Sequence, residues 1–193
     1  ENQLAEFVEK HRDVRDSHQL FSKYHTIDKV PEPKGFKKLS YSIQIGQKSQ
    51  SEKILENARK NFFAKFNYFP TDTIQVWTEN RGESRELRVG DLMSQSVSLY
   101  PFGFVKLLSM DRISVIYDEE MRVGFSIVTT EMHDEIGEHT AWVVVRDDGI
   151  WMEVASVSKY KGYIFGPAKM FADFLRVRAH KRALERLKNV LVV

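Results

Sequence analysis

"RVGFSIVTTEMHDEIGEHTAWVVVRDDGIWMEVASVSK", residues 122–159, contains three apolar runs separated by two polar connections. The runs at 122–130, 139–147 and 150–158 are short and rich in β-branched and aromatic residues, which favours strands over helices. "RDDG" (146–149) joins the second run to the third and is typical of a tight hairpin turn. Strands joined by hairpins pair antiparallel. This stretch therefore predicts three neighbouring strands of an antiparallel sheet.

Strand patterns continue towards the N-terminus. Four further segments have the alternating or β-branched pattern of strands: 36–46, 73–79, 86–98 and 111–118. "ENRGES" (79–84) and "YDEEMR" (117–122) are typical of hairpin turns. "YPFGFVKLLS" (100–109) predicts an apolar connection between two of the strands. The sequence thus predicts a sheet of about seven strands.

Three segments have apolar residues at helical spacing. Residues 49–69 predict a helix rich in aromatic side chains, and residues 3–24 predict a weaker amphipathic helix. Pro167 begins the third helix, 167–191, because proline suits the first helical position. This C-terminal helix carries a predicted apolar stripe: Met170, Phe171, Phe174, Val177, Leu184, Leu187 and Leu191.

The linker "DKVPEPKG" (28–35) separates the first helix from the rest of the chain, since its prolines and glycine interrupt regular structure. We therefore expect residues 1–33 to form an N-terminal helical arm and linker, and residues 34–193 to form the main domain. Antiparallel strands with helices on one side define the α+β class. The predicted architecture is a curved antiparallel sheet that grips the long C-terminal helix.

This order of elements resembles the helix-grip fold of the START and birch-pollen-allergen superfamily. Members of that superfamily commonly hold apolar ligands between the sheet and the C-terminal helix. The resemblance therefore implies a lipid-like small molecule as a partner.

A narrower resemblance rests on individual residues. The family catalogued as domain of unknown function nineteen-ninety, found in bacteria and plants, has Gly-Phe on a strand, then His-x-Glu-x-Gly-Glu, an aromatic-rich strand, and a serine before a basic helix. The matching positions here are Gly124, Phe125, His133, Glu135, Gly137, Glu138, Trp151, Glu153 and Ser158. The likeness covers roughly residues 31–190 and favours a bacterial source. It implies no particular activity.

Composition excludes several classes of site. The chain has no cysteine, which rules out disulfides, thiolate nucleophiles and cysteine-based zinc sites and suits the cytoplasm. A net charge of +2, without a stacking platform or a helix-turn-helix pattern, argues against nucleic acid as a partner. We expect neither a signal peptide in "ENQLAEFVEK" (1–10) nor a membrane-spanning segment.

The polar connection "TTEMHDEIGEH" (129–139) is the first candidate site. His133, Glu135, Glu138 and His139 are suitable zinc ligands, but their spacing matches no helical His-Glu-x-x-His motif, so we expect no metal. Gly137 suits a turn. We expect a structured loop in which His133 and Glu138 lie at the rim of a ligand cavity.

Trp142, Trp151 and Glu153 form the second candidate group. Trp151 and Glu153 share one face of their strand, so a concave position would bury the Glu153 carboxyl among apolar groups and raise its pKa. The alternative is that Glu153 faces water or pairs with an arginine or lysine of the C-terminal helix. Trp142 lies on a strand that is apolar on both faces. Together with Phe171 or Phe174, the two tryptophans are the predicted cavity wall.

Three functional hypotheses remain. The first is binding of an apolar or amphipathic small molecule between sheet and C-terminal helix, with Glu153 and His133 as polar contacts. The second is an enzyme that uses Glu153 and His133 as an acid–base pair, although no catalytic motif is present and no cofactor is expected. The third is an interaction module that contacts a partner or an anionic membrane through the arm or the basic helix 167–191. The sequence does not determine the oligomeric state.

Overall fold

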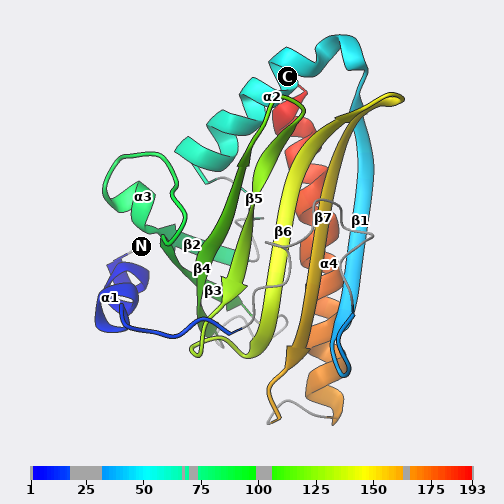
Figure 1. Cartoon of the computed structure of the whole chain (residues 1–193). Helices are drawn as coiled ribbons and strands as arrows, with labels where there is room; N and C mark the ends of the chain where they lie inside the picture. The colour runs from blue at the N-terminus through cyan, green and yellow to red at the C-terminus, as the bar shows by residue number, and fades with distance from the viewer. Residues whose placement is uncertain are drawn as a thin grey trace.

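A seven-stranded antiparallel sheet dominates the computed structural model, which describes residues 2–17, 32–66, 68–69, 74–98, 106–162 and 166–192 (Figure 1). The strands are β1 Lys37–Gly46, β2 Ile74–Thr78, β3 Leu92–Ser98, β4 Lys106–Asp118, β5 Arg122–Thr129, β6 Glu135–Arg146 and β7 Gly149–Tyr160. The helices are α1 Asn2–Lys10, α2 Ser51–Arg59, α3 Glu79–Gly82 and α4 Gly166–Leu191, with a 3-10 turn, η3 Lys48–Gln50, before α2 and a π-helical turn, η4 Lys60–Ala64, after it.

The order of strands across the sheet follows the chain, with one exception. Strands β2 to β7 are neighbours in sequence order, and β1 pairs with β7 at the far edge, Lys37 opposite Ser158. All the ladders between these strands are antiparallel. The predicted α+β class and the seven strands are therefore confirmed.

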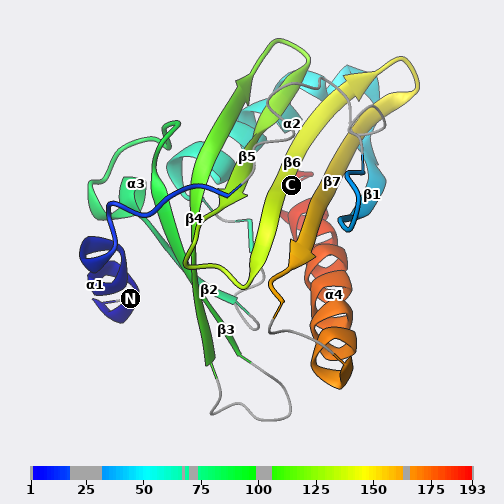
Figure 2. The same cartoon turned by 60° about the horizontal axis from the view of Figure 1, so that its bottom comes forward.

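One face of the sheet, called the inner face below, is covered by helices. α4 lies along β7 and β1, and its C-terminal end meets α2, which lies over β5 and β6 (Figures 1 and 2). The curved sheet thus holds a long C-terminal helix, which confirms the predicted helix-grip arrangement. The opposite face is called the outer face.

The main hydrophobic core fills one end of the space between the inner face and the helices. Leu184, Leu187 and Leu191 of α4 pack there with α2 and with alternate residues of β6 and β7. Alternation along a strand sends every second side chain to the same face. Ala141, Val143 and Val145 of β6 and Ile150, Met152 and Val154 of β7 are therefore the inner-face residues.

An aromatic cluster borders this core. Phe62, Phe66 and Tyr68 surround Phe125 of β5, with ring centroids 5.0–5.5 Å from it. All four side chains are almost fully buried. Edge-on and tilted contacts at such distances stabilise aromatic pairs beyond the area that they bury. The cluster fixes the chain that leaves η4 against the middle of the sheet.

The N-terminal segment packs on the outer face. Leu4 and Val8 of α1 are buried, and Val8 packs with Leu92 and Met110 of β3 and β4. The following residues continue along the sheet, and Asp16 forms a β-bridge with Thr130. The predicted helix 3–24 therefore ends at residue 10, and residues 18–31, which contain the first half of the predicted linker, lie outside the described part. The boundary at residue 33 stays a prediction.

Several predicted bounds were wrong. Residues 79–82 form α3 and not a hairpin turn, and β3 begins at Leu92 and not at residue 86. Side chains replace strand pairing in this segment, since Asn80 Nδ2 donates to Phe63 O and Glu79 Oε2 accepts from Leu92 N. β4 begins at Lys106, inside the predicted connection 100–109, and β6 begins at Glu135.

We expect Gly124→Ala to destabilise the sheet. A Cβ at Gly124 would lie 2.3 Å from Ala141 O and 2.4 Å from Trp142 Cβ on the paired strand β6. Because the strand backbone must shift to make room, the free energy of unfolding should fall by about 1–3 kcal/mol. Urea denaturation measures the change.

The matched control is Gly162→Ala, where an added Cβ meets no atom within 4 Å. It should change the free energy of unfolding by less than about 0.5 kcal/mol. Equal stability of the two variants would contradict the close packing of β5 on β6.

Candidate functional site

A cavity of about 470 Å³ lies between the inner face and the N-terminal half of α4. Side chains of β2 to β7 form one wall, and α4 forms the other. Most of the wall is apolar: Tyr68, Phe69, Ile74, Val97, Leu107, Ile127, Ala172, Leu175, Ala179 and Ala183. This end of the sheet–helix interior is hollow, whereas the other end is filled by the core.

Small side chains on α4 explain the hollow. The helix presents residues 172, 175, 176, 179, 180 and 183 to the cavity, which is the spacing of one helix face. Three of these residues are alanines, whereas the filled end carries Leu184, Leu187 and Leu191. The predicted stripe was therefore wrong in its first half, because Met170 and Phe174 are exposed.

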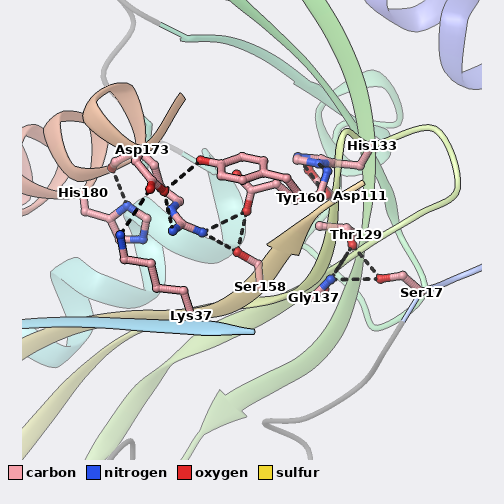
Figure 3. Close-up of polar contacts among 12 residues, drawn as sticks. Ser17, Lys37, Asp111, Thr129, His133, Gly137, Ser158, Tyr160, Asp173 and His180 are labelled. Atoms are coloured by element: carbon pink, nitrogen blue, oxygen red, sulfur yellow. Dashed lines mark hydrogen bonds and ion pairs between the residues drawn. The ribbon is translucent and has the colours of Figure 1, made fainter. Parts of the chain in front are cut away.

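One polar group in the wall is centred on Asp111 of β4, which is 1% exposed. Its Oδ2 accepts a hydrogen bond of 3.0 Å from Gln95 Nε2, and its Oδ1 lies 3.7 Å from His133 Nε2 (Figure 3). Burial raises the pKa of Asp111 to about 6. This carboxyl is therefore anionic only above about pH 6.

The hydrogen bonds of His133 decide its tautomer. Its Nδ1 lies 2.9 Å from the backbone N–H of Glu135, which can only donate. Nδ1 is therefore the acceptor, and Nε2 carries the proton. Gln95 Nε2 lies 3.1 Å from that nitrogen, but two N–H donors cannot hydrogen-bond to each other. The acceptor beside both is the carboxylate of Asp111, which takes a hydrogen bond from Gln95.

A second polar group surrounds Arg176 of α4. Its Nη1 donates to Ser158 Oγ at 2.5 Å and to Glu135 Oε2 at 3.2 Å, and its Nη2 donates to Asp173 Oδ1 at 3.0 Å. The hydroxyl of Tyr160 also donates to Asp173 (Figure 3). Two carboxylates thus neutralise the guanidinium, and this network joins α4 to the ends of β6 and β7.

Two histidines in edge-on contact form the third polar group. The rings of His139 and His180 are 4.9 Å apart and edge-on, and His139 Nε2 lies 2.9 Å from Tyr68 Oη. His180 Nδ1 donates to Arg176 O at 2.8 Å, so its Nε2 is a bare acceptor. Burial lowers the pKa of His139 well below its ordinary value, and burial lowers the pKa of His180 as well. Both rings are therefore neutral near pH 7.

Four buried polar atoms in the cavity wall have no hydrogen-bond partner within the protein: Asp111 Oδ1, Ser156 Oγ, Arg176 Nε and His180 Nε2. Native proteins rarely leave buried polar groups unpaired, because each such group costs about 1–3 kcal/mol. A molecule inside the cavity is one way to supply the missing partners.

The structure places three predicted wall and contact residues elsewhere. Trp142 and Glu153 lie on the outer face, where the indole Nε1 donates to Glu153 Oε2 at 2.7 Å and Arg146 pairs with the other oxygen. Trp151 lies on the same face, and its indole donates to Asp148. The concave position considered for Glu153 was therefore wrong, and its carboxylate pairs with Arg146 of the neighbouring strand β6, not with a base of the C-terminal helix.

This placement also separates the hypothetical acid–base pair. His133 lines the cavity on the inner face, whereas Glu153 lies on the outer face, so one substrate cannot meet both. Phe174 is 57% exposed and outside the cavity wall. The side chain of Phe171 lies outside the described part of the structure.

The stretch 129–139 is mostly strand. Only residues 130–134 connect β5 to β6, and the remainder belongs to the two strands. His133 and Glu138 both line the cavity, and Ser114 Oγ donates to Glu138 Oε1 at 2.6 Å. Within the ranges that the structure describes, no three histidine or carboxylate side chains are grouped to hold a metal ion.

Comparison with known proteins gives one family assignment. Residues 22–186 match the family described as Domain of unknown function (DUF1990). The chain belongs to the DUF1990 family. No curated protein matches it.

Solved structures resemble the chain only distantly. Ara h 8.0201 has 11% sequence identity and a TM-score of 0.49, and 82% of this chain covers 99% of that one. Major latex-like protein 151 from Panax ginseng has 17% identity, a TM-score of 0.45 and coverages of 79% and 95%. An uncharacterised protein from Rhizobium leguminosarum has 13% identity, a TM-score of 0.45 and coverages of 81% and 94%. At this distance, none of the three indicates a ligand for this chain.

The residues that match the DUF1990 sequence pattern have two roles in the structure. His133, Glu135 and Ser158 contribute polar atoms to the cavity wall. Gly124 and Gly137 allow close packing of strands, since a Cβ at Gly137 would lie 2.2 Å from Val157 O. The turn that was expected at Gly137 is absent, because this residue lies inside β6.

Sequence reasoning missed the central polar residues of the cavity: Tyr68, Asp111, Tyr160, Arg176 and His180. Asp111 is an acid within an apolar strand, and that signal could have identified it. Arg176 and His180 are four residues apart on a helix, which places them on one face. No helix in the described ranges is long and apolar enough to cross a membrane.

Acid should destabilise the protein through its buried histidines. The folded state lowers the pKa of His139 and of His180, so below about pH 6.5 the unfolded chain binds protons that the folded protein does not. Stability should therefore fall as the pH drops from 7 to 5. The raised pKa of Asp111 acts in the opposite direction below about pH 6 and offsets part of this loss.

The variant His139→Phe isolates the contribution of His139 to this pH dependence of stability. Urea denaturation at several pH values should show a pH slope that is shallower than in the wild type by up to about 1.4 kcal/mol per pH unit. His11→Phe, on the N-terminal segment away from the inner face, is the matched control and should keep the wild-type slope. If His139→Phe also keeps that slope, His139 is protonated as readily in the folded protein as in the unfolded chain.

Proposed function

We propose that the protein binds an apolar or amphipathic small molecule in the cavity between the inner face and α4. The supporting observation is the pairing of a mainly apolar hollow of about 470 Å³ with four buried polar atoms that lack partners. Ligand pockets combine an apolar wall with a few placed polar groups in this way, and their volumes begin at about 300 Å³.

The apolar part of the wall supplies affinity. Tyr68, Phe69 and Leu175 give it large surfaces, and apolar area removed from water contributes roughly 25 cal/mol per Å². The polar groups supply orientation, because a buried group that stays unpaired after binding weakens the complex. The expected ligand is therefore elongated and mostly hydrocarbon, with its polar end near Asp111 or Arg176.

The other hypotheses have less support. Arg176 of α4 pairs with the protein's own carboxylates, and Arg186 donates to Phe69 O. Contact of the remaining basic residues with an anionic membrane or a partner stays a prediction, as does a cytoplasmic location.

Native mass spectrometry of the freshly purified protein, followed by solvent extraction, tests the proposal directly. A stoichiometric extra mass would support it and would identify the chemical class of the ligand. Titration with N-phenyl-1-naphthylamine, a neutral fluorescent probe of apolar sites, provides a second test on protein without a bound molecule.

We expect Ala179→Phe to abolish binding. Ala179 lines the cavity and has no side-chain hydrogen bond, so a phenyl ring there occupies ligand space without removing a polar contact. Probe affinity should fall at least tenfold, while the free energy of unfolding should stay the same or rise because the cavity is filled.

The control is Lys188→Phe, the same new side chain at an exposed position of the same helix outside the cavity wall. It should bind the probe as the wild type does. Unchanged binding by Ala179→Phe would contradict the proposed site.

A further inference from the structure

The polar part of the cavity wall offers mostly hydrogen-bond acceptors and negative charge. The acids Asp111, Asp134 and Glu135 line it with one permanent base, Arg176, whereas the Glu138 carboxylate is on the Trp142 side of β6. The two Nη atoms of Arg176 already bind Glu135 and Asp173, so its charge is largely compensated. A carboxylate or phosphate at the polar end of a ligand would therefore meet net repulsion.

The unpartnered atoms also favour a ligand that donates hydrogen bonds. Asp111 Oδ1 can only accept when the carboxyl is ionised, and His180 Nε2 can only accept because its Nδ1 holds the proton. Ser156 Oγ can act in either role. Only Arg176 Nε is restricted to donating. Two of the four positions thus require a ligand that donates hydrogen bonds.

The space between Asp111 and His133 restricts the functional group of the ligand further. The proton on His133 Nε2 faces Asp111 Oδ1, but the 3.7 Å between these atoms is too long for a hydrogen bond. One oxygen atom placed about 2.8 Å from each can bridge them, if it accepts from His133 and donates to Asp111. A hydroxyl does both, whereas an ether cannot donate and an ammonium cannot accept.

We propose that the ligand carries a hydroxyl group, alcohol or phenol, that binds between Asp111 and His133, donating to Oδ1 and accepting from Nε2. This inference rests on the proposed function and specifies the class of its ligand. The hydrocarbon part then lies along the alanine face of α4. Fatty acids and phosphate esters are the classes that the site rejects.

Three probes with the same alkyl chain test the inference: decan-1-ol, its methyl ether 1-methoxydecane, and decanoate. Each displaces N-phenyl-1-naphthylamine from the wild-type protein at pH 8, where Asp111 is ionised. The alcohol should bind about tenfold or more tightly than either the ether or the carboxylate, since hydrogen bonds to a charged group are the strong ones.

The variant Asp111→Leu tests whether the preference for the alcohol arises at Asp111. It should lose the preference for the alcohol over the ether. Asp118→Leu, at the exposed far end of the same strand, should keep that preference. If Asp111→Leu does not fold, His133→Phe replaces it, because it removes the Nε2 donor with a ring of similar shape.

The outcomes separate the two proposals. If the wild type binds alcohol and ether equally, or prefers decanoate, or if Asp111→Leu keeps the preference, the hydroxyl site is wrong while the ligand cavity stands. If neither the fluorescent probe nor any of the three amphiphiles binds the wild type, the proposed function itself fails.

Discussion

The packing of the C-terminal half of α4 is the interaction on which the rest of the structure depends. Leu184, Leu187 and Leu191 anchor the helix against α2 and the inner face, and this contact sets the distance between helix and sheet. A helix is a stiff rod, so its N-terminal half keeps that distance. Ala172, Ala179 and Ala183 are too short to fill the space. The cavity thus results from one helix that carries large side chains at one end and small ones at the other.

The same anchoring offsets the loss of stability that the polar wall causes. Asp111, Arg176 and His180 are buried with atoms that have no partner in the protein, which lowers stability. A continuous core at the other end and an ordered aromatic cluster around Phe125 offset this cost. Unpaired polar groups concentrated at one end of an otherwise consistent fold are typical of functional sites.

Sequence patterns were sufficient for the order and type of nearly every element, because strand and helix periods are local properties. They were insufficient for the site. β6 is apolar on both sides, so nothing local showed that Trp142 and Glu153 face away from α4. Asp111, His133 and His180 come from three different elements, and only the register of the sheet and the rotation of α4 bring them to one cavity. The prediction placed Phe174 in the cavity wall because it is large and aromatic. The residues of α4 that create the cavity are its small alanines.

The pairing of β1 with β7 has a consequence for biosynthesis. Lys37 leaves the ribosome before its partner Ser158 and before all of α4. Until then β1 has no neighbouring strand, and the inner face has no C-terminal helix to cover it. Contacts between distant parts of a chain form slowly, because a long loop must close first. The nascent chain therefore carries an open sheet edge and an uncovered apolar face until β7 and α4 have been made, and such surfaces are prone to aggregation.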